Sequence, residues 1–262
     1  MRETIAAFFA RHPECRLRAL GARDNAAALD LAPFGQPAEY LDAAANAAWV
    51  ERYHAANRAR FPEPLALPGW VLVDLYLLPA AIGVLTCPAR LCDARPAGLG
   101  DDDEAVAAAY YAAPSIVAGT VVGVSLISLR EGIGAAAIIK ALTLKMLRAT
   151  TQQGIAQWDN PSLRVHTRMG ALRLLGPAPS AHEKGASSFL YAVDLTDDIS
   201  WREAMTRKEK ATTEAPAGAS WMPVADHAAL RELLSCAANG ERIHILPPGL
   251  SGDRRRVLVR RG

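Results

Sequence analysis

The chain has 262 residues, of which 51% are hydrophobic and 21% are charged, and its formal net charge is +2. This composition predicts a globular protein with a sizeable buried core and excludes an intrinsically disordered chain. The small net charge gives no indication of nucleic-acid binding. The cysteines form no CxxC pair and no metal-type spacing with a histidine (Cys15, Cys87, Cys92 and Cys236). We therefore expect reduced thiols in a cytoplasmic protein without a bound metal.

The N-terminal quarter of the chain is predicted to be mainly helical. The expected elements are a helix over residues 5–11, a strand over 15–20, a helix over 23–31 and a long alanine-rich helix over 38–60. Two short apolar runs follow, over residues 70–78 and 82–86. Their loose alternation and flanking prolines predict an antiparallel hairpin.

Residues 90–104 are rich in proline, glycine and acids, which predicts a surface loop that leads into a short helix over 105–113. Residues 105–129 carry no charge and are long enough to cross a bilayer. However, Pro114, two glycines, several hydroxyl residues and the β-branched second half are unfavourable for a membrane helix. The composition therefore favours a buried segment and no membrane insertion.

A glycine turn between a strand and a helix is the most informative feature of the sequence. Residues 121–129 are rich in valine, isoleucine and leucine and predict a buried strand. From Ala135, apolar residues recur three and four positions apart, which predicts an amphipathic helix that ends at Gly154. The start of such a helix has free N–H groups and the positive end of the helix dipole. A turn of this kind can hold a phosphate.

This arrangement resembles the GNAT superfamily of acyl-coenzyme A transferases. That family carries a glutamine or arginine, two residues, a glycine, one residue, and a glycine or alanine between its fourth strand and third helix. Gly132 and Gly134 match the two small positions. Leu129 occupies the basic position, and Arg130 lies one residue later. This departure leaves the backbone cradle of the motif but puts a side-chain contact with the pyrophosphate in doubt.

A second match lies downstream, where the family has a fifth strand, an asparagine, a short helix, and a tyrosine four residues before a glycine. Residues 155–158 match the strand, Asn160 the asparagine and Gly170 the glycine. His166 stands where the family has its tyrosine, which is the general acid. The chain thus resembles a GNAT protein whose proton donor is an imidazole. The alternative for His166, which we favour less, is a surface histidine on an arginine-rich helix.

The resemblance implies a mixed α/β (α+β) fold with a mostly antiparallel sheet flanked by helices. Residues 1–195 would form the GNAT-like domain, and residues 196–262 a C-terminal extension that packs on or completes it. The remaining expected elements are strands over 171–176 and 188–195, a polar linker over 196–223, a helix over 226–238 capped by Asp226, and a hairpin formed by 243–246 and 257–259.

The resemblance also implies an acyl-coenzyme A co-substrate, carrying an acetyl or a longer or carboxylated acyl group. The residues implied in its binding are Leu126, Leu129, Arg130, Gly132, Ile133, Gly134, Ala135 and Asn160. His166 would protonate the departing thiolate. A strand hydroxyl could donate to the thioester carbonyl. Ser125 and Ser128 cannot both do so because strand side chains alternate, and we prefer Ser128, although such serines also simply satisfy a strand.

The expected reaction moves an acyl group from coenzyme A, or from an acyl carrier protein, to a small amine or hydroxyl acceptor. One alternative is a GNAT-like decarboxylase of malonyl or methylmalonyl thioesters, in which Arg164 and Arg168 bind the carboxylate. Another is a module that binds an acyl thioester or a protein without catalysis. A homodimer formed through the terminal hairpin is compatible with the sequence.

Overall fold

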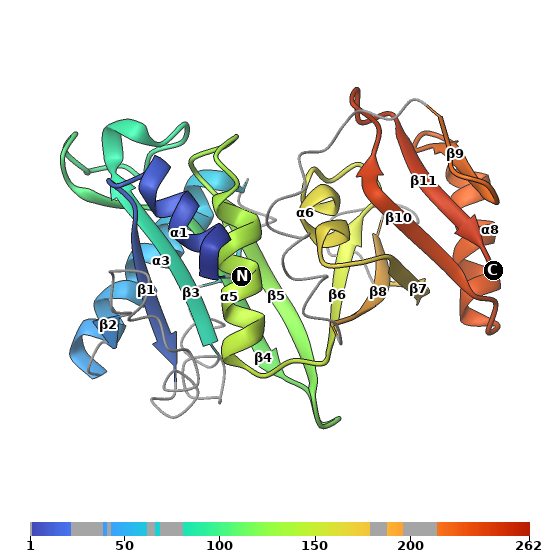
Figure 1. Cartoon of the computed structure of the whole chain (residues 1–262), viewed down its shortest axis with the longest axis horizontal. Helices are drawn as coiled ribbons and strands as arrows, with labels where there is room; N and C mark the ends of the chain where they lie inside the picture. The colour runs from blue at the N-terminus through green and yellow to red at the C-terminus, as the bar shows by residue number, and fades with distance from the viewer. Residues whose placement is uncertain are drawn as a thin grey trace. The chain divides into compact units, whose positions relative to one another are not determined.

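The computed structural model describes residues 2–21, 39–40, 43–61, 66–68, 81–178, 188–195 and 214–262. The chain divides into two compact units, Met1–Ala149 and Thr150–Gly262 (Figure 1). The predicted helix over 23–31, the predicted strand over 70–78 and most of the predicted linker lie outside the described residues. The predicted division into a GNAT-like domain (residues 1–195) and a C-terminal extension (residues 196–262) stays a prediction.

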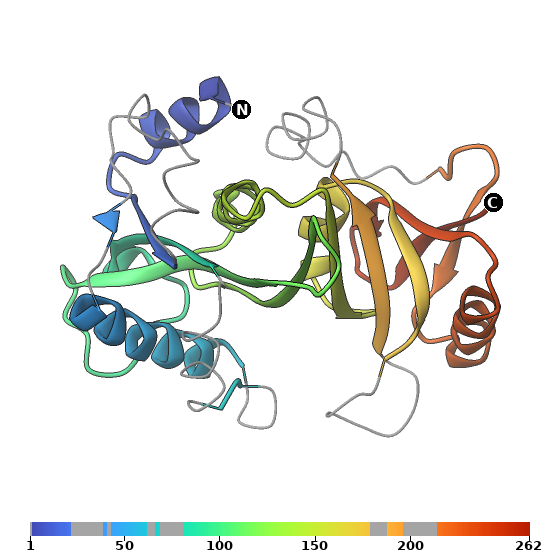
Figure 2. The ribbon, with the colours of Figure 1, turned by 90° about the horizontal axis from the view of Figure 1, so that it is seen from below.

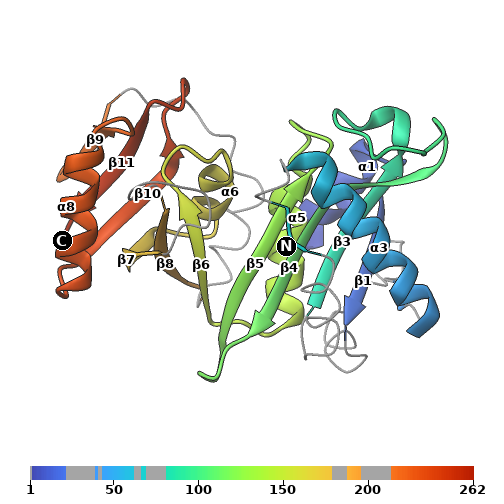
Figure 3. The same cartoon turned by 180° about the vertical axis from the view of Figure 1, so that it is seen from behind.

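The first unit is a sheet covered by helices. Its elements are α1 (Arg2–Arg11), β1 (Arg16–Gly21), β2 (Glu39–Tyr40), α3 (Ala43–Arg60), β3 (Ala81–Pro88), η2 (Ala89–Leu91), β4 (Glu104–Pro114), β5 (Thr120–Ser128) and α5 (Ala135–Met146). The strand order is β2-β1-β3-β4-β5, and every pair except the short parallel β1–β2 pair is antiparallel. Helices α3 and α5 cover opposite faces (Figures 2 and 3). The long predicted helix over 38–60 begins later than expected, because Glu39 and Tyr40 pair with β1.

Strand β4 corrects the helix predicted over residues 105–113. Alanine favours helices in isolation, but this segment is hydrogen-bonded to β3 on one side and to β5 on the other. Residues 105–112 are buried throughout. With α3 and α5 on the two faces, alanine side chains allow both helices to approach the sheet, and this packing overrides the local preference. The charge-free stretch is thus a strand pair, and no helix in the described part of the chain is long and apolar enough to span a membrane.

In its described residues, the second unit contains the remaining strands and the helices α6 and α8. Its elements are β6 (Thr151–Gln157), α6 (Ser162–Arg168), β7 (Leu172–Pro177), β8 (Ser188–Asp194), β9 (Ala219–Pro223), α8 (His227–Ala238), β10 (Ile243–Leu250) and β11 (Arg256–Arg261). The strand order is β6-β8-β7-β10-β11-β9, with antiparallel pairing. The predicted cap is confirmed, because Asp226 Oδ1 accepts a hydrogen bond from Ala229 N at 3.1 Å.

Two local predictions were wrong in this region. Gly154 does not end a helix, since α5 ends at Met146 and Gly154 lies inside β6 opposite Tyr191. A Cβ at position 154 would lie 2.7 Å from the Tyr191 hydroxyl, so the glycine makes room for a neighbouring side chain. The end of the predicted linker forms β9 instead, because it pairs with β11. The predicted fold class, a mixed α/β protein with a mostly antiparallel sheet flanked by helices, is confirmed.

Candidate functional site

The turn between β5 and α5 is open on its outer side. Gly132 and Gly134 have φ angles of 77° and 83°, which glycine adopts at little cost. A Cβ built on either residue would meet no atom within 4 Å. Glu131 and Gly132 are exposed to solvent, whereas Ala135 is buried where the helix joins the core. The turn therefore exposes its backbone along one side.

The start of α5 has N–H groups that no other described residue uses. Gly134 is the N-cap and provides no side-chain hydrogen bond. The N–H groups that donate no hydrogen bond within the described part of the chain belong to Gly132, Ile133, Gly134, Ala135 and Ala136. Together with the positive end of the helix dipole, these donors suit a phosphate or pyrophosphate.

Asp93 holds this turn from the other side, a role that the sequence did not reveal. Its carboxylate Oδ2 accepts a hydrogen bond from Glu131 N at 2.6 Å. The backbone N–H groups of Asp93 and Ala94 donate to Leu129 O at 2.6 and 3.2 Å. On the β4 side, Leu129 N and Arg130 N both donate to Ala107 O. These bonds fix the entry to the turn and preorganise the open N–H groups.

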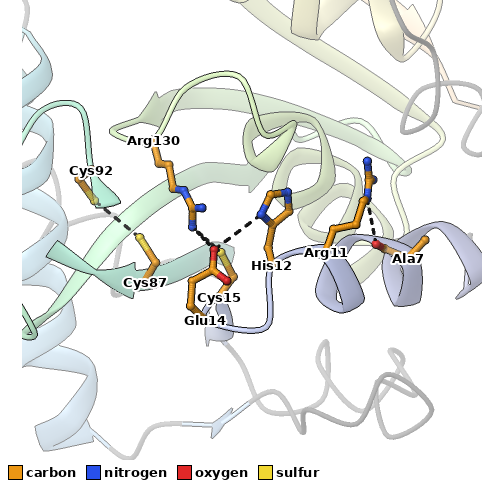
Figure 4. Close-up of polar contacts among 8 residues, drawn as sticks. All are labelled: Ala7, Arg11, His12, Glu14, Cys15, Cys87, Cys92 and Arg130. Atoms are coloured by element: carbon orange, nitrogen blue, oxygen red, sulfur yellow. Dashed lines mark hydrogen bonds and ion pairs between the residues drawn. The ribbon is translucent and has the colours of Figure 1, made fainter. Parts of the chain in front are cut away.

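The Arg130 side chain points toward Glu14 and Cys15, in the connection between α1 and β1 (Figure 4). Its Nη1 lies 2.5 Å from Glu14 Oε1 and 3.5 Å from Cys15 Sγ, and its side chain is only 14% exposed. The guanidinium is thus engaged in a largely buried ion pair. The predicted roles of Arg130, Leu126 and Leu129 in coenzyme binding stay predictions. For Arg130, the guanidinium already donates to Glu14 Oε1 and the backbone N–H to Ala107 O.

The two serines of β5 lie on opposite faces of the strand, as expected. Ser125 Oγ accepts a hydrogen bond from Asn57 Nδ2 of α3 at 3.3 Å. Ser128 Oγ donates to Arg130 O at 3.0 Å, immediately before the glycine turn. Ser128 is therefore the serine next to the open N–H groups, whereas Ser125 belongs to the α3 side.

The remaining predicted residues lie in the second unit. Asn160 Oδ1 accepts a hydrogen bond from Ser162 N at 2.9 Å and so opens α6. His166 is 6% exposed, and its ring centroid lies 5.3 Å from that of Tyr191. His166 is therefore buried, not solvated. His166 lies on α6, and its packing on Tyr191 of β8 could not be seen in the sequence. Whether Asn160, His166 and Ser128 act together stays a prediction.

The surroundings of His166 and Arg164 contain several polar side chains. Gln152 Nε2 donates to Tyr191 Oη at 2.9 Å, and burial raises the pKa of Tyr191, so this phenol stays protonated at neutral pH. Arg164 Nη2 donates to the carbonyl oxygens of Ser251 and Gly252. Because its guanidinium holds backbone carbonyls, Arg164 gives little support to the carboxylate-binding role of the decarboxylase alternative.

A cavity of about 570 Å³ opens beside the C-terminal half of α3 in the first unit. Its lining residues are His54, Arg58, Phe61, Ala66, Leu67 and Pro68. Asn57 is buried next to it, and its Oδ1 accepts a hydrogen bond from Leu67 N at 2.8 Å. Among the described lining residues, two are basic side chains of α3 and the others are apolar. The sequence analysis singled out none of these lining residues for binding.

No protein-family model matches the sequence, and no curated protein matches it. Among solved structures, the chain is similar to a putative GNAT-family acetyltransferase from Desulfovibrio desulfuricans, with 11% identity, a TM-score of 0.41, and coverage of 69% of this chain and 99% of the other. The Salmonella typhimurium protein yncA, a putative acetyltransferase determined with its cofactor acetyl-CoA, has 15% identity, a TM-score of 0.40, and coverage of 61% and 93%.

Nourseothricin acetyltransferase has 14% identity and a TM-score of 0.34, over 44% of this chain. The chain spans 65% of the length of that protein. All three proteins are described as acetyltransferases or putative acetyltransferases.

Proposed function

We propose that this protein is an acyltransferase that moves an acyl group from acyl-coenzyme A, or from an acyl carrier protein, to a small amine or hydroxyl acceptor. The observation that carries the proposal is the open glycine turn at the start of α5, with its unused N–H groups. A pyrophosphate needs several donors fixed in one place, and this turn has them in the position that the GNAT motif implies. The thioester supplies an activated acyl group.

The protein has a modest chemical task in this proposal. The turn holds and orients the donor, and the reaction then needs a proton for the departing thiolate. We assign that proton to the His166 imidazole. Ser128 is the hydroxyl that we assign to the thioester carbonyl, which requires its Oγ to rotate away from Arg130 O. Both assignments rest on the sequence motifs and on the positions of the residues within their own elements.

The cavity on α3 is where we place the acceptor. Arg58 and His54 lie one helical turn apart and line the same cavity. A guanidinium next to apolar surface suits an acceptor that carries an anionic group beside an apolar body.

Replacement of Arg58 by alanine is expected to raise the KM for anionic acceptors about tenfold, because one charged hydrogen bond is lost, while the KM for the acyl donor stays unchanged. Arg52→Ala is the matched control. Arg52 lies on the same helix, next to Trp49 and Glu104, and does not line the cavity. The KM for the acceptor is measured for both variants by steady-state kinetics. An equal rise of this KM in the two variants would contradict the placement of the acceptor.

The activity is tested by free-thiol release and product mass spectrometry with acetyl-, malonyl- and longer acyl-coenzyme A. Each donor is presented with and without a mixture of amines and alcohols. Acceptor-dependent thiol release is the expected result. Loss of carbon dioxide from malonyl-coenzyme A without thiol release would identify the decarboxylase instead. Binding without turnover would identify the non-catalytic module, and absence of binding to every thioester would refute the proposed function.

A further inference from the structure

Two cysteines of the first unit lie in contact beside the glycine turn. Cys87 lies near the end of β3, and Cys92 follows η2. Their Sγ atoms are 3.8 Å apart, although both thiols are free. A disulfide bond is about 2.0 Å long, so the two sulfur atoms must move closer together before a bond can form. Figure 4 shows the pair with Cys15 and Arg130 nearby.

The surroundings of the pair favour a reactive thiolate. The hydrogen bond from Cys92 and the positive charge of Arg130 lower the pKa of Cys87 to about 7, against the opposing effect of burial. Cys87 is 2% exposed, whereas Cys92 is partly exposed. Cys92 is therefore the solvent-facing member of the pair.

The pair is connected to the turn through the next residue in the chain. Cys92 precedes Asp93, whose carboxylate accepts the hydrogen bond from Glu131 N and whose N–H donates to Leu129 O. A shift of Cys92 toward Cys87 therefore pulls on the residue that fixes the entry to the turn. In addition, Arg130, which belongs to the turn, contributes its charge to Cys87. Chemistry at the sulfur atoms and the shape of the turn are thus coupled over a few bonds.

We propose that Cys87 and Cys92 are a redox modification site, at which a peroxide forms a disulfide that displaces Asp93 and weakens coenzyme binding at the turn. The Cys87 thiolate attacks the peroxide, the O–O bond breaks, and a sulfenic acid and water form. The Cys92 thiol then attacks the sulfenic sulfur, the S–S bond forms and a second water leaves. The two thiols lose two electrons to the peroxide, and their protons end in water. A dithiol reductant reverses the step.

The first test detects the disulfide directly and needs no coenzyme. The full chain is treated with hydrogen peroxide, the remaining thiols are alkylated, and peptides are mapped by mass spectrometry. A Cys87–Cys92 disulfide that dithiothreitol reverses is expected in the wild type and in Cys236→Ser, and it is absent in Cys92→Ser and Cys92→Ala. Cys236 is the matched control because it is also partly exposed but lies on α8 of the second unit. A Cys15–Cys87 bond, or no bond in folded protein, overturns the proposal.

The second test measures whether the disulfide weakens coenzyme binding, and this part of the proposal rests on the proposed function. Calorimetry with coenzyme A is expected to give a Kd about fivefold or more higher for the oxidised than for the reduced wild type. In Asp93→Ala the oxidised and reduced forms are expected to bind equally, because the connection to the turn is already cut. An equal Kd for both forms of the wild type overturns the coupling. No binding by the reduced wild type refutes the proposed function instead, while the disulfide map still stands on its own.

Discussion

Gly134→Ala is expected to weaken the binding of coenzyme A by about 10- to 100-fold. The residue is the N-cap of α5, has a φ angle of 83°, and contributes its N–H to the open side of the turn. An alanine there disfavours the left-handed conformation and places a methyl group in the open space where we expect the pyrophosphate. Loss of one hydrogen bond to a charged group costs about 1.5–3 kcal/mol, which corresponds to that range of Kd.

A comparison of two ligands separates the turn from the rest of the site. Acetyl-pantetheine has the thioester and the amides but no pyrophosphate, so its affinity should be equal in the wild type and in Gly134→Ala. Gly218→Ala is the matched control for backbone strain. Gly218 has a φ angle of 75° and equally open surroundings, but it precedes β9 in the second unit. Equal losses of coenzyme A affinity in the two variants, or an equal loss for acetyl-pantetheine in Gly134→Ala, would show that the turn does not hold the pyrophosphate.

His166→Gln is expected to lower kcat about 100-fold or more and to leave the Kd of coenzyme A unchanged. General acid catalysis contributes about 10²–10⁴ in rate. A general acid must be protonated, so kcat of the wild type should fall as the pH rises. In His166→Gln this alkaline fall should disappear. Stopped-flow or steady-state measurements of thiol release across the pH range give both the drop in kcat and its pH dependence.

Because His166 is buried against Tyr191, its replacement also disturbs packing. Tyr191→Phe changes the same cluster, since it removes the hydroxyl that accepts from Gln152 Nε2 and keeps the ring. We expect it to lower the free energy of unfolding without removing the pH dependence of kcat. If both variants lose activity in proportion to their loss of stability, and both keep the pH profile of the wild type, His166 is a packing residue and not the proton donor.

Features of the fold that depend on near neighbours in the chain could be predicted from the sequence. Asp226 and the apolar spacing after it define α8, and the valine-rich run, Gly132 and Gly134 define β5, the turn and the start of α5. Capping, glycine conformation and helical periodicity act over a few residues. For this reason the most specific part of the candidate site, the phosphate-type turn, was already visible in the sequence.

The errors and omissions all involve partners that are distant in the sequence. The alanines of residues 105–113 form a strand because β3 and β5 lie on either side of them, and Gly154 is explained by Tyr191. The carboxylate of Asp93 lies on the N–H of Glu131, 38 residues later in the chain, and the guanidinium of Arg130 lies on Glu14.

By itself, the sequence determined many of the local elements, the open glycine turn and the class of fold. Only the tertiary structure decided which side chains stay available for chemistry. It engages Arg130 in a buried ion pair, buries His166, and brings Cys87 and Cys92 into contact. The physical reason is that local preferences are small and are overridden by packing and hydrogen bonds between segments that meet only when the chain folds.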